Sequence, residues 1–242
     1  LKFAVVPDAA QLAQGRSWRA QAPRPVVMLA SSREGEEALW LENLRSKTAS
    51  ARVQLAQAAI NSEANSLESA SRTVLPVQWL IVPRHPQRFD EVHQQLLQAG
   101  LTVSRRSTWT GAPGAADVWL GDSLGEMALY YGLAHVAMLG GSFAPLGGQN
   151  LIEAAACGCP VVLGPHTFNF ADAAERACAA GAAQRVADME QGLAAATDLA
   201  RDPVRLAAAQ ETTTAFAHAH RGTARATAVA VLRLLERGSR RR

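Results

Sequence analysis

The sequence predicts an α/β fold, a Rossmann-like parallel sheet flanked by helices. Five apolar runs without polar alternation predict strands that are buried on both faces, at residues 26–30, 77–82, 117–120, 135–139 and 160–163. Amphipathic stretches alternate with these runs and predict helices, at about 35–46, 87–99, 124–133, 151–157 and 169–180. Because strands and helices alternate, we expect parallel strands joined by right-handed crossovers.

The part of the chain before the first strand does not follow this pattern. Residues 1–24 contain Gly15, two prolines and few apolar residues in series, which favours a linker from a domain missing upstream. The start at Leu1 likewise indicates a fragment. Residues 47–73 are rich in Ala, Ser, Gln and Asn with weak periodicity, so we expect a variable insertion, a helix extension or a mobile loop.

The chain reads as helical from Asp188 to its end. Pro203 is expected early in one helix, and Gly222 separates the last two helices. We therefore expect one Rossmann-like domain over residues 25–222, followed by a C-terminal helix and basic tail over residues 223–242.

Composition and charge exclude several classes of protein. With 242 residues, of which 48% are hydrophobic and 19% charged, the chain can bury a core and is too apolar to be disordered. No run reaches the ~18 apolar residues of a membrane span. The net charge of +3 owes much to arginines in the tail, so we expect no nucleic-acid partner. The tail is either a solvated terminus or a contact with anionic membrane lipids.

Three polar pairs follow apolar runs at the spacing of a capping box. In each, a Ser or Asn precedes a Glu by three residues: Ser31 and Glu34, Ser123 and Glu126, Asn150 and Glu153. Each pair could simply satisfy free N–H groups at a helix start. All three would lie at the carboxyl edge of the sheet, where open α/β folds bind ligands. Carboxylates there can also accept hydrogen bonds from sugar hydroxyls, while helix amides favour an anion.

The turn Pro83–Arg84–His85–Pro86 follows the second predicted strand. It brings a guanidinium and an imidazole to the same edge, and Pro86 suits a first helical position. Arg84 suits a phosphate, against the alternative of a surface ion pair. His85 is either a ligand contact or a histidine packed at a helix start.

A glycine-rich loop follows the fourth predicted strand. Gly140–Ser142 and Gly147–Asn150 allow the backbone to approach a ligand closely. The chain contains neither GxGxxG nor GxxxxGK[ST], which argues against a dinucleotide dehydrogenase and a P-loop NTPase. Carboxylates at the helix starts would repel a polyphosphate, so a nucleotide with one or two phosphates fits better.

Metal and nucleophile chemistry have little support in the sequence. Cys157, Cys159 and Cys178 lack CxxC spacing and are expected to be reduced core thiols. Ser142 lies in no GxSxG elbow. His166 is expected to brace the turn after the fifth strand, with a catalytic role as the alternative. We expect no metal site.

Together, these motifs resemble the bacterial 3-deoxy-D-manno-octulosonic acid (Kdo) transferases of lipid A assembly. The resemblance runs in order and spacing from Leu1 to about Gly222, through residues 30–37, 83–86 with 88–89, 121–126, 140–142 with 150–153, and 164–170. It implies the C-terminal, donor-binding half of a GT-B glycosyltransferase. The chain departs from the family at Arg33 and Gln149, where many relatives have His, and in the longer segment 47–73.

The resemblance also implies a reaction and a set of contacts. The family transfers Kdo from CMP-Kdo to a lipid A precursor at the cytoplasmic face of the inner membrane, with inversion and without an obligatory metal or other cofactor. Its catalytic base lies in the N-terminal domain, so no catalytic residue is expected in this chain. By resemblance, CMP would contact Pro83, Arg84, Leu124, Gly125, Glu126, Asn150, Leu151, Ile152 and Glu153, and further candidate donor contacts are Ser31, Ser32, His85 and Ser142.

Two other readings stay open at this point. A GT-B transferase that uses a UDP-sugar, or a nucleotide-sugar epimerase, would use the same sheet edge. A non-catalytic nucleotide-binding fragment is the alternative from a different class.

Overall fold

The computed structural model describes residues 5–46 and 75–219. The expected insertion at residues 47–73, Gly222 and the expected C-terminal helix and tail at residues 223–242 lie outside the described residues.

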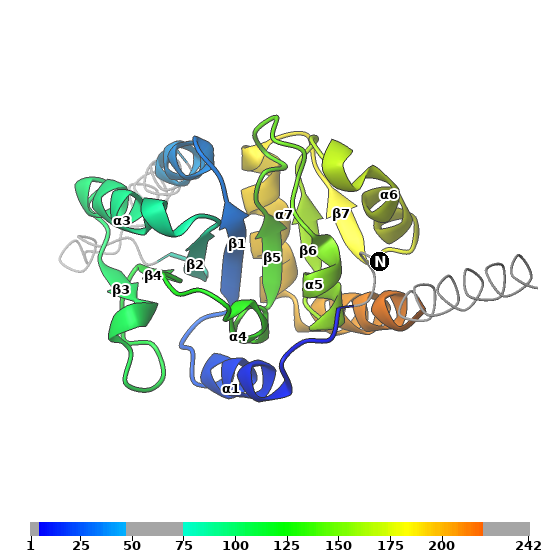
Figure 1. The fold of residues 1–242 in the computed structure, drawn as a ribbon, viewed down its shortest axis with the longest axis horizontal. Coiled ribbons are helices and arrows are strands. Elements are labelled where there is room, and N and C mark those ends of the chain that lie inside the picture. The colour runs from blue at the N-terminus through cyan, green and yellow to red at the C-terminus, as the bar shows by residue number, and fades with distance from the viewer. Residues whose placement is uncertain (1–4, 47–74, 220–242) are drawn as a thin grey trace, which may run out of the picture.

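The described residues form a parallel sheet with the strand order β3-β4-β2-β1-β5-β6-β7 (Figure 1). Every neighbouring pair is parallel. The strands are β1 (Val26–Ser32), β2 (Gln78–Pro83), β3 (Val103–Arg105), β4 (Val118–Leu120), β5 (Val136–Leu139), β6 (Val161–Leu163) and β7 (Ala183–Arg185). The five predicted strands are confirmed. The two outer strands, β3 and β7, were not predicted, because each has three residues and carries polar, partly exposed side chains.

Helices cover both faces of the sheet. Side chains of α1 (Ala9–Ala20), α4 (Met127–Leu133), α5 (Leu151–Ala156) and α6 (Ala171–Ala179) share one core with the sheet. On the opposite face, a second core includes side chains of the helix over residues 36–46, of α3 (Phe89–Gln98) and of α7 (Met189–Arg201). Burial on both faces explains why the central strands are continuously apolar.

The last described helix begins as expected at Pro203 and runs through residue 219. The Asp202 carboxylate caps it by accepting hydrogen bonds from the backbone N–H groups of Val204 (3.1 Å) and Arg205 (3.0 Å). Side chains of this helix reach both cores, since Leu206 packs in one and Phe216 in the other. Across the parts of the chain that the structure describes, no helix is both long enough and apolar enough to span a bilayer.

Within the segment 1–24 that we expected to be a linker, residues 9–20 form a packed helix, α1. The Asp8 side chain caps α1, and Trp18 is buried in the core. Gly15, which contributed to the linker interpretation, lies against α4, where a Cβ atom would meet the Leu129 carbonyl oxygen at 2.1 Å. The glycine is thus required by close helix packing. The expectation that this segment leads from an upstream domain stays a prediction.

Candidate functional site

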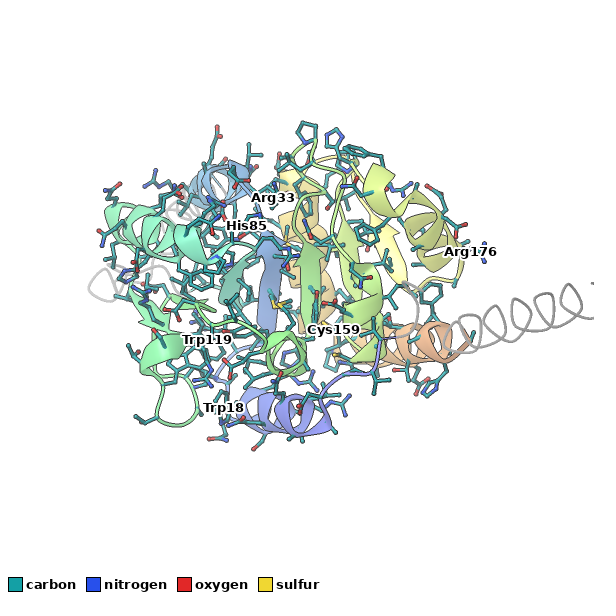
Figure 2. All side chains as sticks on the ribbon, viewed as in Figure 1. Trp18, Arg33, His85, Trp119, Cys159 and Arg176 are labelled. Carbon is teal, nitrogen blue, oxygen red and sulfur yellow. The ribbon has the colours of Figure 1, made fainter. Side chains whose placement is uncertain are left out.

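A pocket of about 130 Å³ lies at the carboxyl edge of the sheet, where β1, β2, β4 and β5 end. In Figure 2, Arg33 and His85, which follow β1 and β2, mark this edge at the top of the view. Among the residues expected to contact the donor, those that line the pocket are Ser31, Pro83, Arg84, Leu124, Gly125, Asn150 and Glu153. The structure therefore brings together residues that are more than 120 positions apart in the sequence.

Arg84 supplies the positive charge of the pocket. Its side chain is exposed, and its backbone N–H donates to the Ser32 carbonyl oxygen at 3.0 Å. Among the described residues, no ion pair involves the Arg84 guanidinium, so its donors are available to an anion. His85 does not line the pocket; it is half-buried, and its carbonyl oxygen accepts from the Arg88 backbone N–H at 3.0 Å.

Asn150 and Glu153 form the helix start that their spacing predicts. The Asn150 Oδ1 atom caps α5 by accepting from the Ile152 backbone N–H at 3.1 Å, and its Nδ2 group donates to Glu153 Oε1 at 3.3 Å. The side chains of Leu151 and Ile152 are buried in the core. Only their backbone atoms could face a ligand.

Glu126 lies beside the pocket, in a network of its own. Its carboxylate pairs with Arg106 at 2.8 Å and accepts a hydrogen bond from the Ser123 hydroxyl, which also contacts the Tyr130 hydroxyl. Because α4 begins at Met127, Glu126 is too early in the chain to form the expected capping box with Ser123. The two side chains are in contact, but they do not cap the helix.

The expected capping box of Ser31 and Glu34 does not form either. Ser31 has a positive φ of 54°, and the helix begins only at residue 36, beyond both members of the pair. Ser32 is buried, and its hydroxyl donates to Glu37 Oε1 at 2.7 Å, away from the pocket. The carboxylate that reaches back to the helix start is Glu36, which accepts from the Arg33 backbone N–H at 2.9 Å.

Glu36 also holds the glycine-rich loop, a role that the sequence analysis missed. Its buried carboxylate accepts backbone N–H bonds from Gly141 (2.7 Å), Phe143 (3.0 Å) and Ala144 (3.2 Å). Burial raises the pKa of Glu36, while these hydrogen bonds favour the ionised form and oppose that rise. The sequence has a run of acidic residues after β1, which indicates a carboxylate at this edge of the sheet. The sequence does not show which of these carboxylates is buried.

Ser142 braces the same loop and does not line the pocket. It is fully buried; its hydroxyl donates to the Leu139 carbonyl oxygen and accepts from the Gly164 backbone N–H at 2.8 Å. Its carbonyl oxygen accepts from the backbone N–H of His166 at 3.0 Å, which ties the turn after β6 to this loop. The expected bracing role of the His166 side chain stays a prediction. Gly140 is needed here because a Cβ atom would lie 2.4 Å from the Ser31 carbonyl oxygen.

The rest of the pocket wall comes from Val82, Ser123, Met127, Tyr131 and Gln149. Tyr131 was missed because it occurs in an apolar helical run, where an aromatic residue reads as core. It is almost fully buried, and burial raises the pKa of its hydroxyl well above the ordinary value. At neutral pH it therefore offers a neutral hydroxyl next to Glu153.

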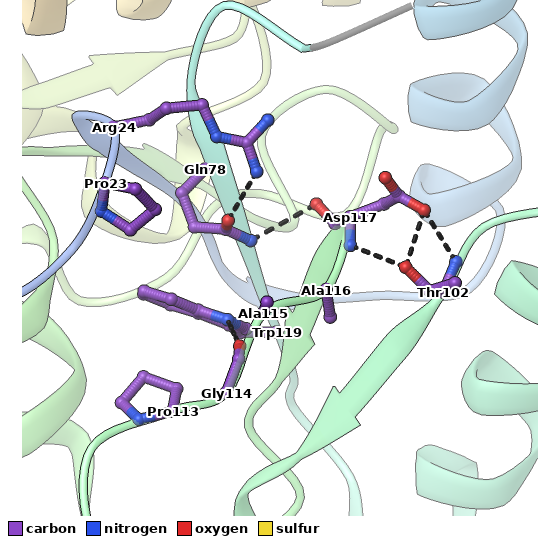
Figure 3. Close-up of a pocket in the computed structure, with 10 residues that line it drawn as sticks. All are labelled: Pro23, Arg24, Gln78, Thr102, Pro113, Gly114, Ala115, Ala116, Asp117 and Trp119. Carbon is purple, nitrogen blue, oxygen red and sulfur yellow. Dashed lines mark hydrogen bonds between the residues drawn. The ribbon is translucent and has the colours of Figure 1, made fainter. Parts of the chain in front are cut away.

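A larger cavity, of about 620 Å³, lies at the opposite edge of the sheet (Figure 3). Its polar groups bond mainly to one another: Arg24 donates to Gln78 at 2.7 Å, Gln78 to the Asp117 carbonyl oxygen at 3.2 Å, and Thr102 to the Asp117 carboxylate at 2.7 Å. We do not assign the ligand site to this cavity despite its larger volume, because its polar groups already hydrogen-bond to one another. Within the described residues, no cluster of three or more His, Cys, Asp or Glu side chains could hold a metal ion.

Sequence comparison confirms the resemblance to Kdo transferases. The chain is 48% identical over 228 residues to the 3-deoxy-D-manno-octulosonic acid transferase of Bordetella pertussis, covering 94% of this chain and 49% of the relative. It is 45% identical over 91 residues to the enzyme of the same name from Haemophilus influenzae, covering 38% of this chain and 21% of the relative. The chain thus spans about half the length, or less, of these curated relatives. No protein-family model matches it.

Solved structures confirm the predicted fold class. The C-terminal CMP-Kdo binding domain of WaaA from Acinetobacter baumannii matches with a TM-score of 0.65 and 29% identity, over 88% of this chain and 98% of that one. Anabaena HepE in complex with UDP-glucose matches with a TM-score of 0.55 and 14% identity, over 92% of this chain and 53% of that one, which supports the fold alone. The fold is that of the C-terminal domain of a GT-B glycosyltransferase.

Proposed function

We propose that this chain is the donor-binding half of a Kdo transferase, and that the pocket at the carboxyl edge binds the CMP part of CMP-Kdo. The observation that carries the proposal is the Arg84 guanidinium, which forms no ion pair with any residue that the structure describes, in a pocket that also contains Gly125, Asn150 and Glu153. The similarity to Kdo transferases over 94% of the chain supports the same donor.

The pocket offers a different chemical partner to each part of CMP. Arg84 neutralises the phosphate, because an exposed guanidinium presents several N–H donors to the phosphate oxygens. The Glu153 carboxylate, held by Asn150, accepts hydrogen bonds from ribose hydroxyls. Leu124 and Gly125 face the base with an exposed apolar side chain and main-chain atoms.

In the proposed reaction, an acceptor hydroxyl attacks the anomeric carbon of Kdo with inversion. The bond from that carbon to the acceptor oxygen forms as its bond to the CMP phosphate oxygen breaks, and a base in the N-terminal half takes the hydroxyl proton. CMP leaves with the bonding electron pair, so its phosphate gains a negative charge. Arg84 stabilises that charge most strongly in the transition state, without a metal ion or another cofactor.

The pocket is small for a complete donor site. Its volume of about 130 Å³ is below the roughly 300–1,000 Å³ of typical ligand pockets. We therefore propose that the isolated chain binds CMP weakly. Because the catalytic base and the acceptor site belong to the N-terminal half of the enzyme, we also propose that this chain alone does not transfer Kdo. In the whole enzyme, the acceptor is a lipid A precursor, the location is the cytoplasmic face of the inner membrane, and the basic tail contacts anionic lipids.

Calorimetric titration of this chain with CMP tests the site. Arg84→Met should weaken CMP binding about 10-fold or more, because a charge-assisted contact to phosphate is lost. Arg176→Met is the matched control, since Arg176 pairs with Asp172 on α6 and its loss should leave CMP binding unchanged. Equal CMP affinity in the unaltered chain and the Arg84→Met variant would contradict the proposed site.

A further inference from the structure

The first helix contacts the turn that lines the candidate donor pocket. The Gln11 side chain of α1 donates through Nε2 to the Gly125 carbonyl oxygen at 3.0 Å, over a separation of 114 residues. Gly125 has a φ of 76°, in the left-handed region that favours glycine. A side chain of α1 is therefore hydrogen-bonded to the residue of the turn 123–126 that has a left-handed backbone conformation.

A second connection runs from α1 to the same turn through Arg106. The Arg106 guanidinium lies 5.5 Å from the Trp18 ring of α1 and 5.8 Å from the Trp109 ring, both within cation–π range. The two indole rings pack edge to face, with centroids 5.8 Å apart. From this aromatic site, Arg106 reaches Glu126 at 2.8 Å. Trp18 and Trp109 thus position the Arg106 guanidinium, which in turn pairs with the Glu126 carboxylate.

The backbone of α1 lies directly against that of α4, the helix that follows the turn. A Cβ atom on Gly132 would lie 2.6 Å from the Leu12 carbonyl oxygen, and one on Gly15 would lie 2.1 Å from the Leu129 carbonyl oxygen. Neither helix can shift far without moving the other. The contacts from Gln11 and Trp18 therefore act on the turn from a fixed position.

The segment before α1 also forms a cavity behind the donor pocket. This cavity, of about 290 Å³, is lined by Val5–Asp8 and by residues shared with the donor pocket: Gly125, Met127, Tyr131 and Glu153. The shared residues form a wall with the donor pocket on one side and the N-terminal segment on the other. Residues 5–20 thus lie against the donor site.

We infer that Gln11 and Arg106 are positioning residues of the donor site, and that α1 sets the geometry of the turn 123–126 for nucleotide binding. Gln11 orients the Gly125 peptide, and Arg106, fixed by Trp18, orients Glu126. The inference that this turn serves a nucleotide rests on the proposed function.

The test measures both the turn and the ligand in the present chain. Gln11→Glu keeps the side-chain shape and replaces the donor with a carboxylate that repels the Gly125 carbonyl oxygen. Gln11→Lys restores a donor at this position, and Arg106→Met keeps the stem on the tryptophans but removes the charge. The matched control is Gln21→Ala, which deletes a comparable side-chain hydrogen bond, from Gln21 at the C-terminal end of α1 to the Ser17 carbonyl oxygen.

The expected result has three parts. Gln11→Glu and Arg106→Met each weaken CMP binding about 2- to 10-fold, while Gln11→Lys recovers most of the affinity and Gln21→Ala changes nothing. Thermal unfolding of the Gln11 variants stays close to that of the unaltered chain, because Gln11 is only partly buried. Hydrogen exchange in the nucleotide-free chain speeds up at residues 123–127 in Gln11→Glu and Arg106→Met, but not in Gln21→Ala.

Two outcomes would overturn the inference. If Gln11→Glu and Arg106→Met bind CMP as the unaltered chain does, neither residue positions the site. If exchange at residues 123–127 is unaltered in both variants, α1 does not hold the turn. Failure of the unaltered chain to bind CMP would count against the proposed function instead, and the exchange measurement would still decide whether α1 positions the turn.

Discussion

His135 makes the stability of the fold sensitive to acid, by an amount that follows from its surroundings. Its Nδ1 atom accepts a hydrogen bond from the Val26 backbone N–H at 2.9 Å. Burial, followed by the nearby charge of Arg19, lowers the pKa of His135 from 6.5 to about 4. Protonation at Nδ1 would break the bond to Val26 and place a second cation beside Arg19.

The direction and size of the effect follow from this shift in pKa. Between pH 6.5 and about 4, the unfolded chain binds a proton that the folded chain does not, so the free energy of unfolding falls as the pH falls through this window. A difference of about 2.5 pKa units corresponds to about 3 kcal/mol. Because His135 is only partly buried, solvent screening reduces the expected loss to about 2 kcal/mol.

The assay is urea unfolding, followed by tryptophan fluorescence, at about pH 7 and about pH 4.5. His135→Asn is the reference variant, because the Asn Oδ1 atom can accept from the Val26 N–H and does not titrate. The unaltered chain should lose about 2 kcal/mol more than the variant, and all other titrating groups cancel in this difference. Equal losses in the two proteins, or a larger loss in His135→Asn, would refute the reasoning.

Three further substitutions and probes test the packing. Glu37→Gln leaves the buried Arg88 guanidinium without its two 3.0 Å bonds to a carboxylate, so the free energy of unfolding in urea should fall by about 3 kcal/mol; an unchanged value would contradict this. Gly15→Ala places a Cβ atom 2.1 Å from a backbone oxygen of α4 and should lower the free energy of unfolding by about 2 kcal/mol. The control Gly111→Ala, with nothing within 4 Å of the new atom, should lower it by less than ~0.5 kcal/mol. A thiol reagent should label half-buried Cys178 first and the two buried cysteines only on unfolding; native labelling of all three at one rate would oppose this assignment.

The central strands of the sheet could be predicted from the sequence, and its two edge strands could not. The central strands are buried on both faces, so their apolar runs carry a clear signal. The outer strands β3 and β7 are short and partly exposed, and their pairing depends on neighbours distant in the chain. Helix α1 was missed because its segment has few apolar residues in series, and the need for Gly15 shows only when Gly132 of the facing helix lies beside it.

The candidate site shows the same division. Arg84, Asn150 and Glu153 could be proposed from the sequence because each follows a strand, and topology brings parallel strand ends to one edge. The partners of Glu126 could not be proposed, since Arg106 reaches it from a short 3-10 helix, Arg106–Thr108, directly after the unpredicted strand β3. Glu36 was also missed, because only the folded loop shows which carboxylate receives the N–H groups of Gly141 and its neighbours.

The most direct test of the central claim is to titrate the unaltered chain with CMP, UMP and UDP in parallel by calorimetry. A donor-binding half of a Kdo transferase should bind CMP more tightly than UMP, which differs from it only in the base, and more tightly than UDP, which differs in the base and in its second phosphate. Tighter binding of UDP or UMP than of CMP would contradict the account and favour a transferase or epimerase that uses a UDP-sugar.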